Sequence, residues 1–137
     1  NICPRKCGAV REDRQGFGVC GMGALPRIAR ASLHHWEEPC ISGENGSGTV
    51  FFSGCTMKCA YCQNYEISHE NFGKTVTVKR LAEIFNELQE KGAHNINLVT
   101  GTHFIKAISE SLQEPLPVPV VYNCGGYESV EALKSLC

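Results

Sequence analysis

The chain has 137 residues, of which 42% are hydrophobic and 20% charged, and its net charge is −1. This composition excludes a disordered or fibrous protein and is typical of a globular chain. No apolar run approaches the roughly 18 residues that a membrane-spanning helix needs, and we find no signal peptide at the start of the sequence. We therefore expect a cytoplasmic protein without a membrane partner.

Charge and cysteine are unevenly distributed along the chain. Residues 1–35 hold six Lys and Arg against two acidic residues, which leaves a net charge of −5 for the remainder. We interpret the basic excess as a solvated face and expect no nucleic-acid partner. Residues 1–48 are rich in Cys, Gly, Pro and Arg, whereas strand-like and helix-like segments alternate from residue 49 onward. We therefore divide the chain into an amino-terminal Cys-rich loop segment, 1–48, and a core, 49–137.

The chain contains nine cysteines. Their odd number, and the predicted helices and strands around them, favour reduced metal-binding thiols over a secreted disulfide scaffold. In the Cys-rich segment, Cys3, Cys7 and Cys20 form a C-x3-C-x12-C pattern. Cys40 follows twenty residues further on. Three or four thiolates in a loop-rich segment could hold zinc or a second iron-sulfur cluster. A set of reduced thiols without a metal is the alternative.

The core begins with a strand and a helix. Residues 49–53 are a short apolar, β-branched and aromatic run, which predicts a buried parallel strand. Residues 77–91 predict an amphipathic helix, with Thr77 as its N-cap and Gly92 just past its carboxyl end. Its apolar residues recur at i, i+3, i+4 and i+7: Leu81, Ile84, Phe85 and Leu88.

Two further strand and helix pairs follow. Residues 96–99 predict a second strand, and 105–112 a helix that is closed by the prolines beyond it. Residues 120–122 predict a third strand, and 130–136 a helix that reaches the chain end without a stop signal. We therefore expect the fold to continue beyond this sequence.

Strand-then-helix units in series predict an α/β fold with a parallel sheet and right-handed crossovers. In barrel-type versions of such folds, functional groups lie on the loops that follow the strands. Those loops are 54–68, 100–103 and 123–127. We expect all three loops to share one rim of the sheet.

The first of these loops carries the most specific motif in the sequence. Cys55, Cys59 and Cys62 form a C-x3-C-x2-C triplet within eight residues. Soft thiolates select zinc or iron-sulfur clusters. A structural zinc site and a ferredoxin cluster both take four ligands, but the next cysteine is Cys124. Three local ligands leave one position open on the metal, which indicates catalysis more than electron storage.

The triplet, with Tyr61 directly before its last cysteine, resembles the signature of the radical S-adenosylmethionine superfamily. Residues 62–65, 95–100 and 122–127 further resemble the branch of the pyruvate formate-lyase activating enzymes. The resemblance implies a partial parallel (β/α) barrel, because the family core normally has about six strand-helix units. The core of this sequence has about three such units.

The resemblance also implies a chemistry. Cys55, Cys59 and Cys62 would hold a 4Fe-4S cluster whose open iron binds S-adenosylmethionine. One electron, from a reductant such as flavodoxin or ferredoxin, would cleave the cofactor to a 5′-deoxyadenosyl radical that abstracts hydrogen from a substrate. In activating enzymes that substrate is a glycine of a partner protein. The family is therefore one of oxidoreductases, and we expect this sequence alone, with half of the barrel, to be inactive.

The resemblance assigns Tyr61 to the cluster and the cofactor. The family's Gly-Gly-Glu segment, which contacts the cofactor amino group, is replaced here by residues 100–103, where Thr100 and Thr102 offer hydroxyls. Helix capping is the alternative for Thr102. Asn123 is a further candidate for cofactor binding, with capping of the following turn as its alternative, and we expect Cys124 to be a buried inert thiol.

Two other functions are compatible with the same residues. An iron-sulfur electron-transfer protein would use the same thiolates without binding a cofactor, and a zinc-stabilised binding module would be colourless. Binding of S-adenosylmethionine to the cluster separates the radical enzyme from both.

Overall fold

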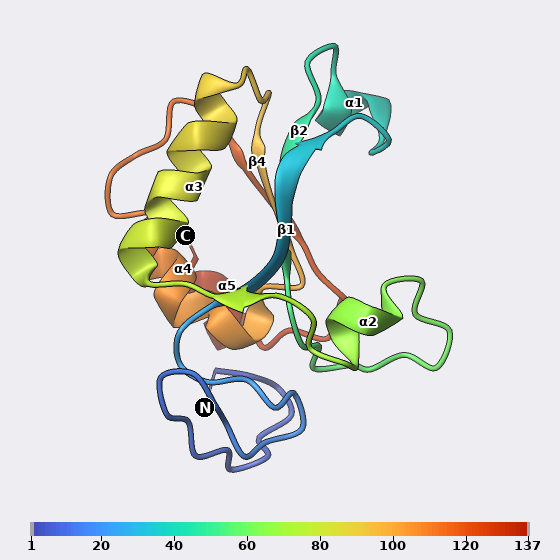
Figure 1. The fold of residues 1–137 in the computed structure, drawn as a ribbon, viewed down its shortest axis with the longest axis vertical. Helices are drawn as coiled ribbons and strands as arrows, with labels where there is room; N and C mark the ends of the chain where they lie inside the picture. The colour runs from blue at the N-terminus through green and yellow to red at the C-terminus, as the bar shows by residue number, and fades with distance from the viewer. Residues whose placement is uncertain (1, 137) are drawn as a thin grey trace.

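The computed structural model describes residues 2–136. Figure 1 shows an open sheet with helices packed beside it and the amino-terminal loops below one end. The strands are β1 (Arg27–His34), β2 (Ser47–Phe52), β3 (Lys74–Thr75), β4 (Ile96–Val99) and β5 (Val120–Asn123). The helices are α1 (Pro39–Ser42), α2 (Tyr65–Ser68), α3 (Val78–Glu90), α4 (Ile105–Ser111) and α5 (Val130–Lys134), with a 3-10 turn η1 at Thr102–Phe104.

The five strands form one sheet in the order β3-β1-β2-β4-β5. The pairs β2–β4 and β4–β5 are parallel, which confirms the predicted α/β fold with three parallel strands in an open, unclosed sheet. The pairs β1–β2 and β1–β3 are antiparallel, so the sheet is mixed where the sequence predicted parallel strands alone. Closure into a barrel is absent from the described part of the chain.

Strand β1 lies within the segment that the sequence analysis treated as loop. It pairs along most of its length with β2, for example Ala31 with Val50 and Ser32 with Thr49. Its sequence, Arg-Ile-Ala-Arg-Ala-Ser-Leu-His, contains few β-branched residues and does not alternate strictly between apolar and polar residues. Pairing with the neighbouring strand, which is a tertiary contact, therefore decides this element.

One hydrophobic core joins the sheet to α3 and α4, which Figure 1 shows on the same side of the strands. The apolar positions predicted for α3 are all buried, at 9% exposure or less. Phe52 and Phe104 pack on one another in the centre, with ring centroids 5.9 Å apart. Phe51 points away from this core and is half-buried, as the alternation of strand side chains requires.

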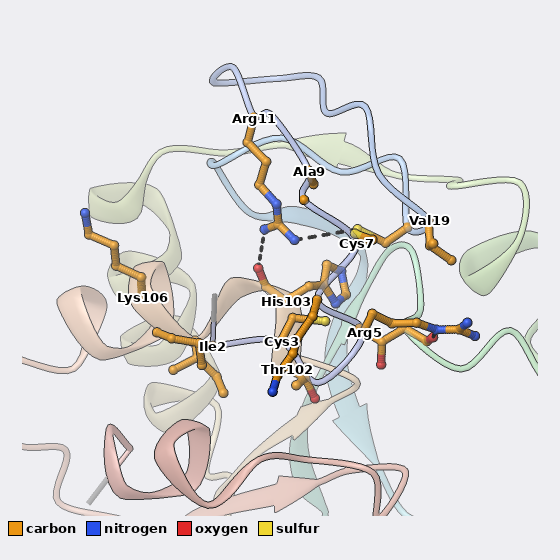
Figure 2. A pocket seen from close by; sticks show the side chains of 15 residues that line it. Ile2, Cys3, Arg5, Cys7, Ala9, Arg11, Val19, Thr102, His103 and Lys106 are labelled. Atoms are coloured by element: carbon orange, nitrogen blue, oxygen red, sulfur yellow. Dashed lines mark hydrogen bonds between the residues drawn. The ribbon is translucent and has the colours of Figure 1, made fainter.

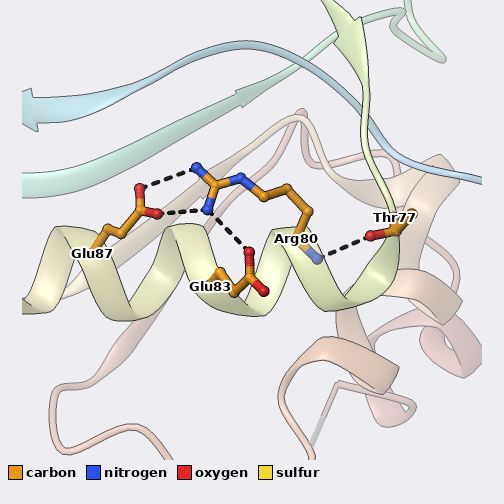
Figure 3. Close-up of polar contacts among 4 residues, drawn as sticks. All are labelled: Thr77, Arg80, Glu83 and Glu87. Atoms are coloured by element: carbon orange, nitrogen blue, oxygen red, sulfur yellow. Dashed lines mark hydrogen bonds and ion pairs between the residues drawn. The ribbon is translucent and has the colours of Figure 1, made fainter.

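Helix α3 begins and ends close to where the sequence predicts. Thr77 is the N-cap, and its hydroxyl accepts a hydrogen bond from the Arg80 N–H over 3.1 Å (Figure 3). Gly92 follows the carboxyl end with φ +91°, in the left-handed region that favours glycine. On the exposed side, Arg80 reaches Glu83 and Glu87. These ion pairs are solvated and add little to stability.

We predict that Thr77→Ala lowers the free energy of unfolding by about 1 kcal/mol, because the first turn of α3 loses its side-chain acceptor. Thr77→Ser is the matched control, since it keeps the hydroxyl and should stay close to wild type. Urea denaturation followed by circular dichroism measures both values. Equal stability of the alanine and serine variants would show that the cap contributes nothing.

The last helix differs from the prediction. Helix α5 ends at Lys134, with Ser135 as its C-cap, instead of running on to the chain end. Its amino end is capped by Ser129, whose hydroxyl accepts from the Ala132 N–H. Among the described residues, we find no helix with the length and hydropathy needed to cross a membrane.

Candidate metal centre

The carboxyl ends of the three parallel strands meet at one edge of the sheet, as the sequence predicts. Phe51 pairs in register with Val99, and Val99 with Asn123, so the loops after these strands start side by side. The imidazole of His103, in the loop after β4, donates a hydrogen bond from Nε2 to the Ser53 carbonyl at the end of β2, over 2.8 Å. This edge therefore forms a single rim.

The loop after β2 carries the cysteine triplet, and we call residues 54–68 the cysteine loop. Its base is closed by a 2.9 Å hydrogen bond from the Gly54 N–H to the Ile67 carbonyl. Its tip lies against the loop after β5, because a Cβ on Gly125 would clash with the Met57 sulfur. The first and third loops of the rim are therefore in contact.

Two of the three triplet sulfurs already accept hydrogen bonds. The Met57 N–H donates to Cys55 Sγ over 3.4 Å, and the Ser68 hydroxyl donates to Cys62 Sγ over 3.3 Å. Such donors stabilise thiolates and raise the reduction potential of clusters bound to them. Cys59 is exposed, and the other two cysteines are half-buried.

The chemistry of this donor set fits an iron-sulfur cluster, since three free thiols lie on one loop and two receive N–H or O–H donors. Within residues 2–136, however, no three Cys, His, Asp or Glu side chains lie close enough together to hold a metal ion. The structure places the triplet on one accessible loop but does not converge its sulfurs.

Gly54 fixes how the cysteine loop leaves the sheet. It has φ +73°, and an added Cβ would lie 2.6 Å from Met22 Cγ and 3.1 Å from the Cys20 carbonyl oxygen. Gly126 has a similar φ of +74°, but a Cβ added to it would have no atom within 4 Å. Substituting Gly126 therefore measures the cost of the left-handed backbone alone, without overpacking. The close approach at Gly54 therefore permits only glycine without rearrangement.

We predict that Gly54→Ala destabilises the fold by about 1 kcal/mol more than Gly126→Ala, because overpacking adds to the cost of the left-handed backbone. The Gly126→Ala variant alone should lose about 1 to 2 kcal/mol. Chemical denaturation of the two variants in parallel gives the difference. Identical losses would mean that Met22 moves aside freely.

Thr102 is buried at 4% exposure and lies within a polar network. The Thr102 hydroxyl donates to Glu128 Oε1 over 2.7 Å and lies 2.8 Å from the Tyr122 hydroxyl, which must therefore donate to it. Burial raises the pKa of Tyr122 to about 12, so the phenol stays protonated. Thr102 caps neither η1 nor α4, so the capping alternative for this residue is wrong.

The other predicted cofactor contacts are more exposed. Thr100 is half-buried with φ +61°, an unusual value for a β-branched residue, at the turn after β4. Asn123 is exposed at the end of β5, and Tyr61 is fully exposed on the cysteine loop. Cys124 is exposed too, so the prediction of a buried thiol is wrong, because the loop after β5 lies at the surface.

The Cys-rich segment packs directly onto this rim. The Arg5 guanidinium donates to the carbonyls of Thr56 and Met57, on the cysteine loop. Arg11 donates to the His103 carbonyl and to Cys20 Sγ, the latter over 3.7 Å (Figure 2). Arg5 and Arg11 therefore tether the segment to the rim, in addition to any solvated basic face of the kind that the sequence suggested.

A cavity of about 290 Å³ lies between the segment and the rim (Figure 2). Cys3, Cys7 and Cys20, the predicted second ligand set, all line it. Burial raises the pKa of the Cys3 thiol, whereas the backbone N–H of Val19 lowers the pKa of Cys7. The structure thus places these three thiols on the walls of one cavity, without bringing them to metal-binding distance of one another.

The sequence analysis missed Arg5, Glu128 and the role of His103 in joining the rim. Glu128 has one oxygen, Oε2, that is buried without a hydrogen-bond partner in the described structure. His103 is buried, and desolvation lowers its pKa to about 4, so it is neutral near pH 7. Arg5 and Glu128 stand in no motif, and the segment 100–103 offered the His103 imidazole without indicating its bond to Ser53. Each of the three residues acts through a contact more than 20 residues away.

The fold and the rim define an α/β domain that presents a cysteine triplet on an accessible loop. Residues 41–114 match the family model of the 4Fe-4S single cluster domain. The match covers more than half of the chain, and the chain belongs to this family of 4Fe-4S cluster-binding domains.

The chain is also similar to an uncharacterised protein of Methanocaldococcus jannaschii, with 30% identity over 146 aligned positions. The alignment covers 99% of this chain and 41% of that relative. The chain therefore spans less than half of the length of the curated relative it matches. No solved structure matches the chain significantly.

Proposed function

We propose that this chain is part of a radical S-adenosylmethionine enzyme whose 4Fe-4S cluster is held by Cys55, Cys59 and Cys62. The observation that carries the proposal is the position of three thiols on one loop, at the rim where the loops of all three parallel strands meet. Catalytic groups of related α/β folds occupy that rim. A cluster with three protein ligands keeps one iron open, and an open metal position serves catalysis.

The cysteine loop would supply both the cluster ligands and hydrogen-bond donors that tune the reduction potential of the cluster. Because the triplet sulfurs do not converge in the structure, the loop must close to bring Cys55, Cys59 and Cys62 together. Its base, fixed by the Gly54 to Ile67 hydrogen bond, stays in place during that closure. The donors on Met57 and Ser68 remain positioned to stabilise the negative charge on the sulfurs.

We propose Tyr61, Thr100, Thr102 and Asn123 as contacts to S-adenosylmethionine. Supporting this assignment, Thr100 and Asn123 stand at adjacent strand ends, joined by a 3.0 Å hydrogen bond from the Thr100 N–H to the Asn123 carbonyl. Thr102 would act by holding the carboxylate of Glu128, whose second oxygen is buried and free to accept from a donor. An ammonium group such as that of S-adenosylmethionine is a suitable donor.

When bound, such a cluster supplies the electron that cleaves S-adenosylmethionine to a hydrogen-abstracting 5′-deoxyadenosyl radical. We propose a small reductase protein, such as flavodoxin or ferredoxin, as the electron donor. The exposed cysteine loop is accessible to it. A glycine of a partner protein is the proposed substrate, by resemblance to the pyruvate formate-lyase activating enzymes.

Electron paramagnetic resonance of the full-length protein tests this function. The protein is reconstituted anaerobically with iron and sulfide, reduced, and measured with and without S-adenosylmethionine. We expect a 4Fe-4S signal whose g values shift when the cofactor is added, because the cofactor binds the open iron. The same measurement on Cys59→Ala should give no signal in either condition.

A reduced cluster signal that S-adenosylmethionine leaves unchanged would contradict the proposal and favour an electron-transfer protein. A colourless protein that takes up zinc in place of iron at the triplet would favour a zinc-stabilised binding module.

A further inference from the structure

The cavity between the Cys-rich segment and the rim gathers thiols from distant parts of that segment. Cys3, Cys7 and Cys20 line it, and they are separated by up to 17 residues in sequence. Cys20 is buried at 4% exposure, whereas Cys7 is exposed. Figure 2 shows Cys3, Cys7 and His103 among the residues that line this cavity, and His103 belongs to the loop after β4.

His103 has the features of an unused metal ligand. Its side chain is 6% exposed and lines the same cavity. Its Nε2 donates to the Ser53 carbonyl, so the neutral ring carries its lone pair on Nδ1. Nδ1 is buried and has no hydrogen-bond partner in the described structure. Metal-binding histidines usually donate their other ring N–H to a backbone carbonyl in this way.

Arg11 joins the two halves of this arrangement. Its guanidinium donates both to Cys20 Sγ and to the backbone carbonyl of His103, so a thiol of the segment and the main chain of His103 share one neighbour. The cavity is also lined by Arg5, Lys6 and Lys106, and its lining includes no Asp or Glu among the described residues. These basic side chains favour a site with net negative charge.

We propose that Cys3, Cys7, Cys20 and Nδ1 of His103 form a second metal site, a Cys3His zinc centre that fastens the Cys-rich segment to the rim. Three thiolates and one imidazole are a common ligand set of structural zinc sites, and they give the bound ion a net charge of about −1. The proposed ligands include none of the triplet cysteines, although the cavity adjoins the proposed cluster site through Thr56 and Thr102 in its lining.

A bound metal would stabilise a part of the chain that has little regular structure. Residues 2–26 of the Cys-rich segment contain two isolated bridges, Arg11 with Gly16 and Gln15 with Met22, and are otherwise turns, bends and irregular backbone. A segment with so little regular structure gains much of its stability from a bound metal. The four ligand residues line one cavity without lying at coordination distance from one another, so zinc would draw the segment inward onto His103.

The test uses the full-length protein carrying Cys55→Ala, Cys59→Ala and Cys62→Ala, so that it does not depend on the cluster. Elemental analysis of this triple variant should find about one zinc per chain. Adding Cys7→Ser, or His103→Gln with its remaining amide donor, should lower the zinc content at least about tenfold. Adding Cys40→Ser should leave it unchanged, because Cys40 lies on α1, at the opposite end of the sheet (Figure 1).

A direct spectroscopic measurement covers the case in which a ligand variant fails to fold. The triple variant, unaltered in the segment, is stripped of metal and loaded with cobalt(II). We expect intense thiolate-to-cobalt charge-transfer absorption in the near ultraviolet, because soft thiolate ligands coordinate the metal. Absence of that absorption, or zinc content unchanged by Cys7→Ser, would overturn the proposal. Iron and sulfide bound instead of zinc would also overturn the zinc assignment.

Discussion

Cys59→Ala should abolish assembly of the 4Fe-4S cluster, lowering iron and sulfide from about four each per chain to background. With one thiol removed, only two cysteines remain on the cysteine loop, and two ligands do not hold a cubane cluster. Cys59 is exposed, so the substitution removes a ligand without opening a cavity in the core. Iron and sulfide assays after anaerobic reconstitution, with the absorption spectrum, measure the loss.

Two matched controls accompany this variant. Cys124→Ala and Cys40→Ala each remove another exposed thiol and should keep the full cluster content. Cys124 is the sharper control, because the loop after β5 touches the cysteine loop through Gly125 and Met57. Retention of iron and sulfide in Cys59→Ala would show that the cluster ligands lie elsewhere, and loss in Cys124→Ala would identify a fourth ligand.

Phe52→Ala should lower the free energy of unfolding by about 3 to 5 kcal/mol, the usual cost of truncating a buried phenylalanine. Phe52 is 1% exposed and packs against Phe104. It ends β2, directly before the turn into the cysteine loop, and it also lies 3.5 Å from the position of a Cβ on Gly101. The truncation would therefore loosen two of the three loops of the rim.

Phe72→Ala removes the same side chain from a position that is 61% exposed, so it serves as the matched control and should cost less than about 1 kcal/mol. Urea denaturation curves of wild type and both variants give the values. A loss below about 1 kcal/mol for Phe52→Ala would mean that the core around Phe104 collapses into the vacated space without penalty.

The cysteine triplet and its family resemblance can be recognised from the amino-acid sequence alone, because the cysteines of this motif lie within eight residues of each other. Residue patterns likewise predicted α3 with its N-cap and the three parallel strands. A helix buried on one face repeats its apolar residues every three or four positions, and a strand buried on both faces is a short continuous apolar run. Such local signals do not depend on distant partners.

Pairing in three dimensions decided the rest. Strand β1 forms because it hydrogen-bonds to β2 as an antiparallel partner, whereas its own residues have little of the composition or alternation typical of strands. The packing of the Cys-rich segment against the rim depends on Arg5 and Arg11. Their guanidinium groups donate hydrogen bonds to carbonyls 51 and 92 residues away in the sequence. No spacing rule connects a cysteine at position 20 to a histidine at 103, and only the tertiary structure brings both to one cavity.

The sequence by itself thus determined the α/β class and the loop that carries the triplet, because hydrophobic period and short-range ligand spacing are properties of neighbouring residues. The tertiary structure decided the mixed sheet, the network of Thr102 with Tyr122 and Glu128, and the orphaned Nδ1 of His103. Each of these features depends on which polar groups are buried together when segments distant in the sequence pack against one another. Such contacts produce no pattern among neighbouring residues of the chain.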